Sequence, residues 1–482
     1  MHELYIIGVT LYWIVAVIAV VQVVMENRQP AKTMAWALVI LLVPVVGITL
    51  YFFFGINTRR ERMASQRSLD QLSKRQMFGF VQQQNLRLPE RHKKLIDLYV
   101  NQNFSLPFKD NAIQIFTTGH DFFASLFEAI GAAREHIHID LYIFEDDALG
   151  MLVSDMLIDK ARQGVEVRVI YDDVGCWNVK HRFFERMRLE GIEVSPFLPV
   201  RFPSFTSKVN YRNHRKLIVI DGRVGFIGGM NIAMRYVSPT WRDTMVRVEG
   251  MGVYALQRAF LIDWYFVDRT LISDRKYYPP LTPHHSPLTT HHSPLTTHHS
   301  PLLQIVTSGP TSPYPEIMQG YVHAITTAQH HIYIETPYFL PTEPVLFALK
   351  TAAVGGVDVR IIVPMRSDTR FVEWAGRSYL REMADAGVGV WLYRDGFIHS
   401  KTMVVDDTLS TCGSTNIDFR SFENNFESNI FVYDCATASH FRELFMDDLN
   451  HAVRLDDVPA RRHPSFFNRL LEGLARLLAP LF

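Results

Sequence analysis

The sequence contains two stretches with the same pattern, His214-Arg-Lys-Leu-Ile-Val-Ile-Asp221 and His399-Ser-Lys-Thr-Met-Val-Val-Asp406. Each is followed by a glycine turn that ends in asparagine, Gly228-Gly-Met-Asn231 after the first and Gly413-Ser-Thr-Asn416 after the second. In both stretches histidine and lysine are two residues apart and a largely β-branched run follows, which predicts a strand with both side chains on one face. One such pair is commonly surface decoration, but two copies with every spacing preserved indicate two copies of one functional unit.

The duplication extends over most of the chain. Gly131–Tyr142 is echoed by Ala328–Tyr338, and Gly164–Ile170 is echoed by Gly356–Ile362. Each copy has the order helix, apolar strand, helix and glycine-preceded β-branched strand, which is typical of βαβ units. The sequence therefore predicts an α/β fold made of two similar halves.

Changes of composition along the chain predict its division into segments. A seven-residue unit, His-His-Ser-Pro-Leu-Thr-Thr, is repeated almost three times from His284 to Leu302. Proline in every unit and the absence of charge favour a flexible extended linker over a metal site. The predicted segments are two transmembrane segments within 1–57, a connector (58–107), the first half (108–270), the His/Ser/Pro-rich linker (271–303), the second half (304–455) and a C-terminal amphipathic segment (456–482).

The composition of the 482 residues excludes several classes of protein. Lys and Arg number 49, as do Asp and Glu, and this balance argues against binding of nucleic acid through a broad basic field. Only three cysteines occur, which excludes a disulfide scaffold and a cysteine-based zinc module. An aromatic content of 12% is too high for a disordered chain.

The N-terminal region contains two uncharged apolar stretches, Leu4–Val24 and Ala35–Gly55, of 21 residues each. About 20 residues of helix cross the hydrocarbon core of a bilayer, so we predict a two-helix transmembrane hairpin with spans at about 4–24 and 35–55. No Lys or Arg precedes the first stretch and a second follows at once, which favours a span over a cleaved signal peptide. Pro44 and Gly47 lie within the second stretch and leave a bent or re-entrant segment open.

Basic residues set the expected orientation of this hairpin. Arg28 and Lys32 lie in its turn, whereas six Lys and Arg residues lie between Arg59 and Arg75 after the second stretch. By the positive-inside rule we expect a multi-pass membrane protein whose large C-terminal part faces the cytoplasm.

The duplicated motif has the residue types needed for chemistry at phosphorus. A neutral imidazole can displace an alcohol from a phosphodiester while a neighbouring ammonium neutralises the phosphoryl oxygens. Asn231 and Asn416 each follow their histidine by 17 residues and are expected to donate amide hydrogens to the same oxygens. Ser414 is also an expected phosphate ligand, and Gly229 takes its place in the first half. No cluster of His, Cys or Asp near the motifs has metal-ligand spacing, so neither a metal nor another cofactor is expected.

These motifs resemble the signature of the phospholipase D superfamily, His-x-Lys-x4-Asp followed by Gly-(Gly/Ser)-x-Asn. The resemblance is closer still to the bacterial cardiolipin synthases of that superfamily, and it covers nearly the whole chain except the linker. Besides the N-terminal segments, the stretches that carry it are Asn213–Gly222, Trp241–Thr244, Thr336–Phe339, Ser378-Tyr379 and Ser421–Glu427.

The resemblance implies both the fold and the site. It implies two α/β halves packed face to face about a pseudo-twofold axis, with one active site on that axis and no obligatory metal. The catalytic residues that it implies are His214, Lys216, Asp221, His399, Lys401 and Asp406.

The resemblance also implies that the acid orienting each histidine lies nearly thirty residues downstream of it. Asp243 follows His214 by 29 residues and Glu427 follows His399 by 28, so we expect these two pairs to be hydrogen-bonded. The aspartates that end the two motifs are then expected to be structural, paired with nearby backbone or basic groups.

The activity implied by the resemblance is a phosphatidyl transfer. Two molecules of phosphatidylglycerol give cardiolipin and glycerol through a phosphatidyl-histidine, with His214 as the nucleophile by family precedent and His399 as acid and base. The symmetry of the sequence does not decide between the two histidines. Hydrolysis of phospholipid or nucleic acid, transfer with another donor or acceptor alcohol, and a membrane scaffold with a dead site stay open.

The expected partners follow from that activity. They are phosphatidylglycerol, cardiolipin and the lipid bilayer of a bacterial inner membrane, and nucleic acid is not among them. The sequence leaves the oligomeric state open, a homo-oligomer included.

The C-terminal segment has a helical pattern with two unlike faces. The leucines at 470, 471, 474, 477 and 478 share one face, and Arg469, Glu472 and Arg476 lie on the other. This pattern suits either a helix in the membrane interface or a helix packed on the catalytic core.

Overall fold

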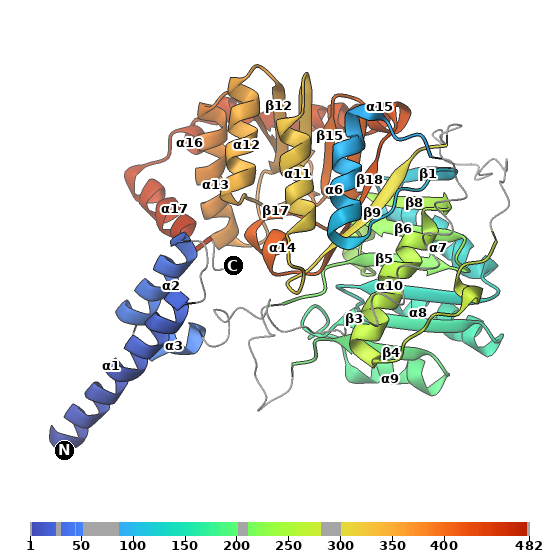
Figure 1. Cartoon of the computed structure of the whole chain (residues 1–482), viewed down its shortest axis with the longest axis horizontal. Coiled ribbons are helices and arrows are strands. Elements are labelled where there is room, and N and C mark those ends of the chain that lie inside the picture. Colours follow the sequence, from blue (N-terminus) through green and yellow to red (C-terminus); the bar gives the residue numbers. More distant parts are fainter. Residues whose placement is uncertain are drawn as a thin grey trace.

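The computed structural model describes residues 2–25, 30–43, 45–51, 86–200, 211–280 and 300–479. Most of the His-Ser-Pro repeat and most of the predicted connector lie outside these residues. Figure 1 shows two α/β halves packed against each other, with the N-terminal helices extending from one end of the molecule.

The first half is a mixed sheet with the strand order β1-β8-β6-β5-β2-β3-β4. β2, β3 and β4 pair in parallel, as the alternation of helix and strand predicts, and the other neighbours pair antiparallel. The strands are β1 (Asn111–Phe116), β2 (His136–Leu141), β3 (Glu166–Asp172), β4 (Glu193–Phe197), β5 (Lys216–Ile220), β6 (Val224–Gly228) and β8 (Met245–Gly250). The helices are α7 (Gly119–Ala132), α8 (Ala148–Arg162), α9 (His181–Leu189) and α10 (Val253–Asp268).

The second half repeats this order as β9-β18-β16-β15-β10-β12-β13 and adds β19 at the edge. The agreement, strand by strand, confirms the predicted duplication. The strands are β9 (Leu303–Ser308), β10 (His331–Glu335), β12 (Asp358–Pro364), β13 (Gly389–Tyr393), β15 (Thr402–Val405), β16 (Leu409–Gly413), β18 (Glu427–Val432) and β19 (Ala452–Arg454). The helices are α11 (Glu316–Thr326), α12 (Glu343–Val354), α13 (Arg370–Asp385), α14 (Phe419–Glu423) and α15 (Cys435–Asn450).

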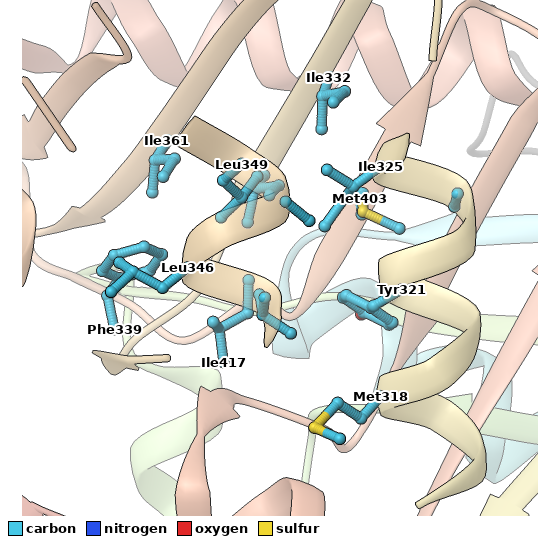
Figure 2. Packing of buried hydrophobic residues seen from close by; sticks show 14 of the residues in the cluster. Met318, Tyr321, Ile325, Ile332, Phe339, Leu346, Leu349, Ile361, Met403 and Ile417 are labelled. Carbon is cyan, nitrogen blue, oxygen red and sulfur yellow. The ribbon is translucent and has the colours of Figure 1, made fainter. Parts of the chain in front are cut away.

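Each sheet buries one face under its own helices. Figure 2 shows this layer in the second half, where Ile325 of α11 and Leu349 of α12 lie in the same apolar cluster as Ile332 of β10. α7, α8 and α9 cover the equivalent face of the first half with Phe122, Val153 and other apolar side chains. The alternation of side chains along the strands gives these buried faces.

The opposite faces of the two sheets meet in a shared apolar core. Leu217 and Val219 of β5 contribute to it from the first half, and Val404 of β15 and Ile430 of β18 contribute from the second. Because this cluster joins the central strands of both halves, the two halves are packed face to face, as the resemblance implies.

The end of the predicted connector belongs to the second half. α6 (Lys93–Asn103) precedes the first half in the chain but packs on α11 and β9. Leu95, Ile96 and Tyr99 of α6 are buried in the core of the second half. A helix that precedes the first half in the sequence is therefore part of the second half in the fold.

The N-terminal arm differs from the predicted pair of long spans. α1 (His2–Met25) contains Ile6–Met25, and in the described part of the chain it is the helix long and apolar enough to cross a membrane. The second apolar stretch forms α2 (Pro30–Leu42) and a short α3 (Val46–Leu50) instead of one continuous helix.

The break between α2 and α3 has a local cause. Val45 has a positive φ of 64°, and a Cβ on Gly47 would lie 2.2 Å from the carbonyl oxygen of Val39. The rings of Trp36 and Tyr51 pack 5.6 Å apart, so α3 lies back against α2. With 13 residues α2 is about 20 Å long, shorter than the roughly 30 Å hydrocarbon core, and a second uninterrupted span is not confirmed.

The C-terminal segment forms α17 (Phe466–Leu478), which packs on α13. Contact is made by the polar side of the helix, with Glu472 and Ala475 buried. Packing on the core was one of the two expected arrangements, but the face that packs is the polar one.

Candidate active site

Both motif histidines lie just before a central strand of their sheet. His214 precedes β5, which begins at Lys216, and His399 precedes β15, which begins at Thr402. The strand was expected to include the histidine, and the structure begins it two or three residues later. The histidines are therefore held by loop backbone, whose hydrogen bonds run to the other half.

The loop before each histidine pairs with backbone of the opposite half. The N–H of His214 donates to the carbonyl of Phe426 at 2.9 Å, and the N–H of Phe426 donates to the carbonyl of Arg212 at 2.8 Å. In the other arm, β14 (Phe397–Ile398) pairs in parallel with β7 (Trp241–Arg242). Each histidine thus lies beside the segment that carries the acid of the other half.

This pairing crosses the two expected histidine–acid pairs. Nδ1 of His214 is 3.1 Å from both carboxylate oxygens of Glu427, and Nδ1 of His399 is 2.7 Å from Oδ2 of Asp243. The expectation paired each histidine with the acid of its own half, and it is wrong. The two acids are the expected residues, but the strand pairing between halves exchanges their partners.

The two orienting acids are buried and held ionised by their surroundings. Burial alone raises the pKa of a carboxyl, but His214 and Lys216 bring the pKa of Glu427 below its ordinary value. For Asp243, burial is likewise outweighed by His399 and Lys401, so its pKa is also lowered. An ionised acid accepts the Nδ1 hydrogen and leaves Nε2 of each imidazole as the nitrogen with a lone pair. Among the described residues, neither Nε2 has a hydrogen-bond partner.

The lysines are buried beside the histidines. Nζ of Lys216 donates to the carbonyl of His214 at 2.7 Å, and Nζ of Lys401 lies 3.0 Å from Nδ1 of His399. Burial lowers the pKa of Lys216 to about 7 and that of Lys401 to about 8. Both amines have lost most of their water, and the charge of a bound phosphate raises the pKa of each and favours the ammonium form.

The charged side chains of each motif also act on the imidazole of the other motif. Burial is the main cause of the lowered pKa of His214, and the charge of Lys401 lowers it further. Burial followed by the charge of Lys401 lowers the pKa of His399 to about 4, and Lys216 of the other half adds to this effect. Both imidazoles are therefore neutral near pH 7 before an anionic substrate arrives.

The aspartates that end the motifs lie away from this site. Asp221 accepts backbone hydrogen bonds from Arg134, Glu135 and His136 at 2.8–2.9 Å, where β2 begins. Asp221 and Asp406 each lie at the turn after their strand and have a positive φ, 53° and 52° respectively. Naming them among the catalytic residues is corrected, and the structural role expected for them is the one observed.

Asp406 makes the equivalent contacts in the second half. It accepts from the backbone of Gln329, His330 and His331 at 2.7–2.9 Å and forms an ion pair with Arg91. Arg91 comes from the connector, so this aspartate also fixes the connector to the second half.

The three expected phosphate ligands have different environments. Asn231 accepts from the N–H of Ile143 at 3.0 Å and donates to the hydroxyl of Tyr236. In the described part of the chain Oδ1 of Asn416 is buried without a hydrogen-bond partner. The hydroxyl of Ser414 donates to Glu427, so in the structure this residue supports an orienting acid and is not free for phosphate.

Aromatic rings surround the two imidazoles. The ring of Tyr142 meets that of His214 edge-on at 5.0 Å, and Trp241 lies 5.3 Å from His399. Tyr338 and Phe397 lie 6.5 Å and 5.9 Å from His399. Sequence reasoning did not place Tyr142, Trp241 or Phe397 at the site, although Trp241 precedes the Arg242-Asp243 pair in a quoted motif.

A largely buried arginine donates a hydrogen bond to the backbone carbonyl of each orienting acid, and neither arginine was predicted as part of the site. Arg215 donates to the backbone carbonyl of Glu427 at 3.1 Å and forms an ion pair with Asp263. The signal for Arg215 was present, since it lies between His214 and Lys216.

The second arginine has the same relation to the other pair. Arg242 donates to the carbonyl of Asp243 at 3.0 Å and pairs with Asp448 at 2.7 Å. A third acid, Glu335, lies 3.9 Å from the guanidinium, and burial followed by the charge of Asp448 raises the pKa of Glu335 to about 8. Arg242 precedes Asp243 in the chain, but only the structure shows the two acids that hold it.

The described residues hold no group of three or more His, Cys, Asp or Glu side chains arranged to bind a metal ion. The side chains that the structure brings together at the two motifs are two imidazoles, two lysine amines and two carboxylates.

Two family models match the chain. A family model described as a cardiolipin synthase, phospholipase D-like domain matches residues 126–264 and 321–449. A second model, described as a phospholipase D-nuclease N-terminal region, matches residues 12–55.

Curated relatives cover nearly the whole chain. The major cardiolipin synthase of Bacillus subtilis (strain 168) is 36% identical over 479 residues, which cover 96% of this chain and 96% of that protein. The cardiolipin synthase of Geobacillus sp. (strain WCH70) is 36% identical over 467 residues, which cover 95% of this chain and 90% of that protein.

A solved structure shares the fold. The phosphatidylserine synthase of Haemophilus influenzae Rd KW20 aligns with a TM-score of 0.59 at 16% identity, covering 82% of this chain and 100% of that one.

Proposed function

The chain belongs to the cardiolipin synthase family of the phospholipase D superfamily, and on this premise we propose the steps by which it makes cardiolipin. The enzyme is a phosphatidyltransferase, and we take phosphatidylglycerol as both donor and acceptor. The observation that carries the mechanism is the pair of imidazoles, one from each half, whose Nδ1 atoms are held by buried acids.

In the first step Nε2 of His214 attacks phosphorus of the donor. The bond from phosphorus to the glycerol oxygen breaks, and His399 gives its Nε2 proton to that oxygen so that neutral glycerol leaves. Lys216 and Lys401 neutralise the phosphoryl oxygens as charge develops there. The product is a phosphatidyl-histidine and a neutral His399.

His399 must carry a proton before this step, although its pKa is lowered to about 4 without substrate. The bound phosphodiester brings a negative charge among the two imidazoles and two ammonium groups, and an anion at this distance raises the pKa of an imidazole. Asp243 stabilises the imidazolium that results. Substrate binding and proton uptake are thus linked.

In the second step the same groups act in reverse. His399 takes the proton from a glycerol hydroxyl of the second phosphatidylglycerol, whose oxygen attacks phosphorus. The phosphorus–nitrogen bond breaks, cardiolipin leaves and His214 is regenerated. Two displacements in sequence predict retention of configuration at phosphorus and no need for a nucleotide.

We also propose the placement of the chain in the membrane. α1 crosses the bilayer, and α2 with α3 enters and leaves on the side of the catalytic halves, because α2 is short and α3 lies back against it. This arrangement puts Arg28 and Lys32 on the same side as the basic residues between Arg59 and Arg75. By the positive-inside rule that side is the cytoplasm.

The test of the reaction is incubation of the purified protein with labelled phosphatidylglycerol, with lipid products identified by mass. We expect cardiolipin and free glycerol from the wild type, and a loss of at least about a thousandfold in His214→Ala and in His399→Ala, because the two imidazoles act as a unit. His120→Ala is the matched control, because the side chain of His120 on α7 is 89% exposed, and we expect it to keep wild-type activity. Phosphatidic acid as the main product, or substantial activity in either variant, would contradict the proposal.

A further inference from the structure

α17 is fastened to the catalytic body by charged side chains on its polar side. Glu472 is 2% exposed and forms an ion pair with Arg381 of α13. Arg476 pairs with Glu382 at 2.6 Å, and its guanidinium lies 4.1 Å from the ring centre of Tyr379. A buried carboxylate is tolerated only with such partners, so these contacts fix which side of α17 faces the protein.

The opposite side of α17 is apolar and exposed. Phe466 and Phe467 are each 75% exposed and Leu477 is 69% exposed. A helix on a soluble protein normally turns its apolar stripe inward, and a contiguous exposed stripe marks contact with another apolar surface. The remaining exposed residues of this stripe are Leu470, Leu471, Leu474 and Leu478.

The charge that accompanies this stripe favours an anionic surface. Glu472 is the one acid in the sequence of α17, and it is buried and paired. Arg469, on the charged side of α17, is exposed. The exposed surface of the helix therefore carries a cation and apolar groups without an acid, which is the combination that binds anionic lipid.

The position of α17 connects it to the membrane-spanning part of the chain. In Figure 1 α17 lies at the end of the molecule from which α1 and α2 extend. The side chains of α1 are themselves exposed, Ile7 to 63% and Ile18 to 60%. The apolar stripe is thus on the part of the catalytic body that α1 holds at the bilayer.

We propose that α17 lies in the plane of the membrane interface, with its phenylalanine and leucine stripe inserted among the acyl chains of anionic lipid. Its polar side carries the catalytic body. α13, to which it is fastened, contacts β11 (Phe339–Leu340), and Tyr338 beside β11 lies 6.5 Å from His399. The helix thereby sets the orientation of the histidines relative to the lipid surface.

A fluorescent probe tests this placement without relying on activity. Cys435 is the exposed cysteine and is replaced by serine, after which Leu474→Cys carries an environment-sensitive dye. Leu189→Cys on α9 is the matched control, because Leu189 is a leucine exposed to 79% on a helix of the first half. The full chain is reconstituted in vesicles of phosphatidylglycerol and phosphatidylcholine with a spin-labelled lipid as quencher.

We expect the dye at 474 to shift to the blue and to be quenched by lipid labelled near the interface, and the dye at 189 to do neither. A dye at 474 that stays in water would overturn the proposal. So would a blue shift without quenching by lipid, together with disulfide linkage of two chains through position 474 in the unlabelled variant, because a second copy would then cover the stripe.

Activity provides a second, separate test. In a triple variant, Leu470→Gln with Leu474→Gln and Leu477→Gln, we expect synthesis from phosphatidylglycerol in vesicles to fall roughly tenfold while α1 still anchors the chain. The rate with short-chain phosphatidylglycerol below its aggregation concentration should stay within about twofold of wild type, since that substrate needs no membrane contact. Wild-type rates on vesicles, or an equal loss on both substrates, would contradict a role in membrane contact.

Discussion

Glu427 and Asp243 differ by one methylene, and the residues beside them match that difference. A Cβ on Gly229 would lie 2.1 Å from Oδ1 of Asp243, so only glycine leaves room for this shorter acid to reach His399. At the equivalent position Ser414 fits and its hydroxyl donates to Glu427. The different lengths of the two acids therefore explain why one half has Gly229 where the other has Ser414. Sequence analysis noted the Gly/Ser difference but did not relate it to the acids.

The crossed pairing predicts which acid acts with which histidine. Glu427→Gln should behave as a His214 variant and Asp243→Asn as a His399 variant, each with a loss of up to about ten thousandfold because the amide favours the wrong tautomer. A donor with a nitrophenol leaving group needs little proton help, so it should rescue phosphatidylation in Asp243→Asn and not in Glu427→Gln. The measurement is the burst of nitrophenol in each variant. Rescue of Glu427→Gln alone would show that each acid serves its own half.

The raised pKa of Glu335, which lies beside Arg242, predicts how the stability of the protein depends on pH. Because the pKa of Glu335 is raised to about 8 in the folded state, its contribution to the free energy of unfolding is complete below its unfolded pKa and is lost as pH rises to about 8. Glu335→Gln has no proton to lose there. Between about pH 5 and pH 8 its free energy of unfolding should fall less steeply, by up to about 1.4 kcal/mol per pH unit.

Urea denaturation of the detergent-solubilised protein at several pH values checks this expectation. The exposed Glu343→Gln on α12 is the matched control and should keep the wild-type slope. An unchanged slope in Glu335→Gln would show that this carboxyl is ionised in the folded protein.

At the scale of the element, helical periodicity predicts faces but not which of them is covered. The sequence placed the leucines and the charges of α17 on opposite sides, and that division is observed. Glu472 and Arg476 are the packed side because α13 presents Arg381 and Glu382 to them. The partner is far away in the sequence, so the periodicity alone could not show it.

The second apolar stretch likewise has a feature that its sequence pattern alone did not predict. Its length predicted a span, while Gly47 left a re-entrant segment open, and the structure has the short helix α2 with α3 against it. The break between α2 and α3 comes with the close approach of Gly47 to Val39, a contact that a count of apolar residues does not contain.

The topology proposed for this element can be measured. With Cys435→Ser as the background, Asn27→Cys lies between α1 and α2, on the cytoplasmic side if α2 and α3 re-enter. A membrane-impermeant maleimide should then label it in inverted vesicles and not in intact cells. Labelling in intact cells would establish two full spans and an external turn.

At the scale of the whole molecule, the duplication could be predicted from the sequence. The pairing of each histidine with the acid of the other half could not. The repeated motifs predicted the two halves, and the family resemblance that they carry implied one site shared between them. The pairing of β7 with β14, and of Asn213 with Phe426, joins segments of opposite halves and exchanges the acids between them. Such long-range register depends on how the finished halves dock, which local patterns do not encode.

The linker between the halves is expected to have no part in the chemistry. Deletion of His284 to His299 should change the rate by less than about twofold, and the wild type should keep its activity in EDTA, because two imidazoles and two lysines supply the charge stabilisation that a metal otherwise gives. Mass analysis of the lipid products checks both expectations. Inactivation by EDTA that a divalent ion reverses would contradict the second.

The most direct test of the composite site is to locate the covalent lipid. A nitrophenyl ester of phosphatidic acid is incubated with His399→Asn and with His214→Ala, and an acid-labile, base-stable adduct is mapped by peptide mass. We predict an adduct on His214 in the first variant and none in the second, because only His214 receives the phosphoryl group. An adduct on His399 in His214→Ala, with none on His214 in the reverse variant, would exchange the two roles. Cardiolipin synthesis by the wild type with no phosphatidyl-histidine under any trapping condition would contradict the mechanism itself.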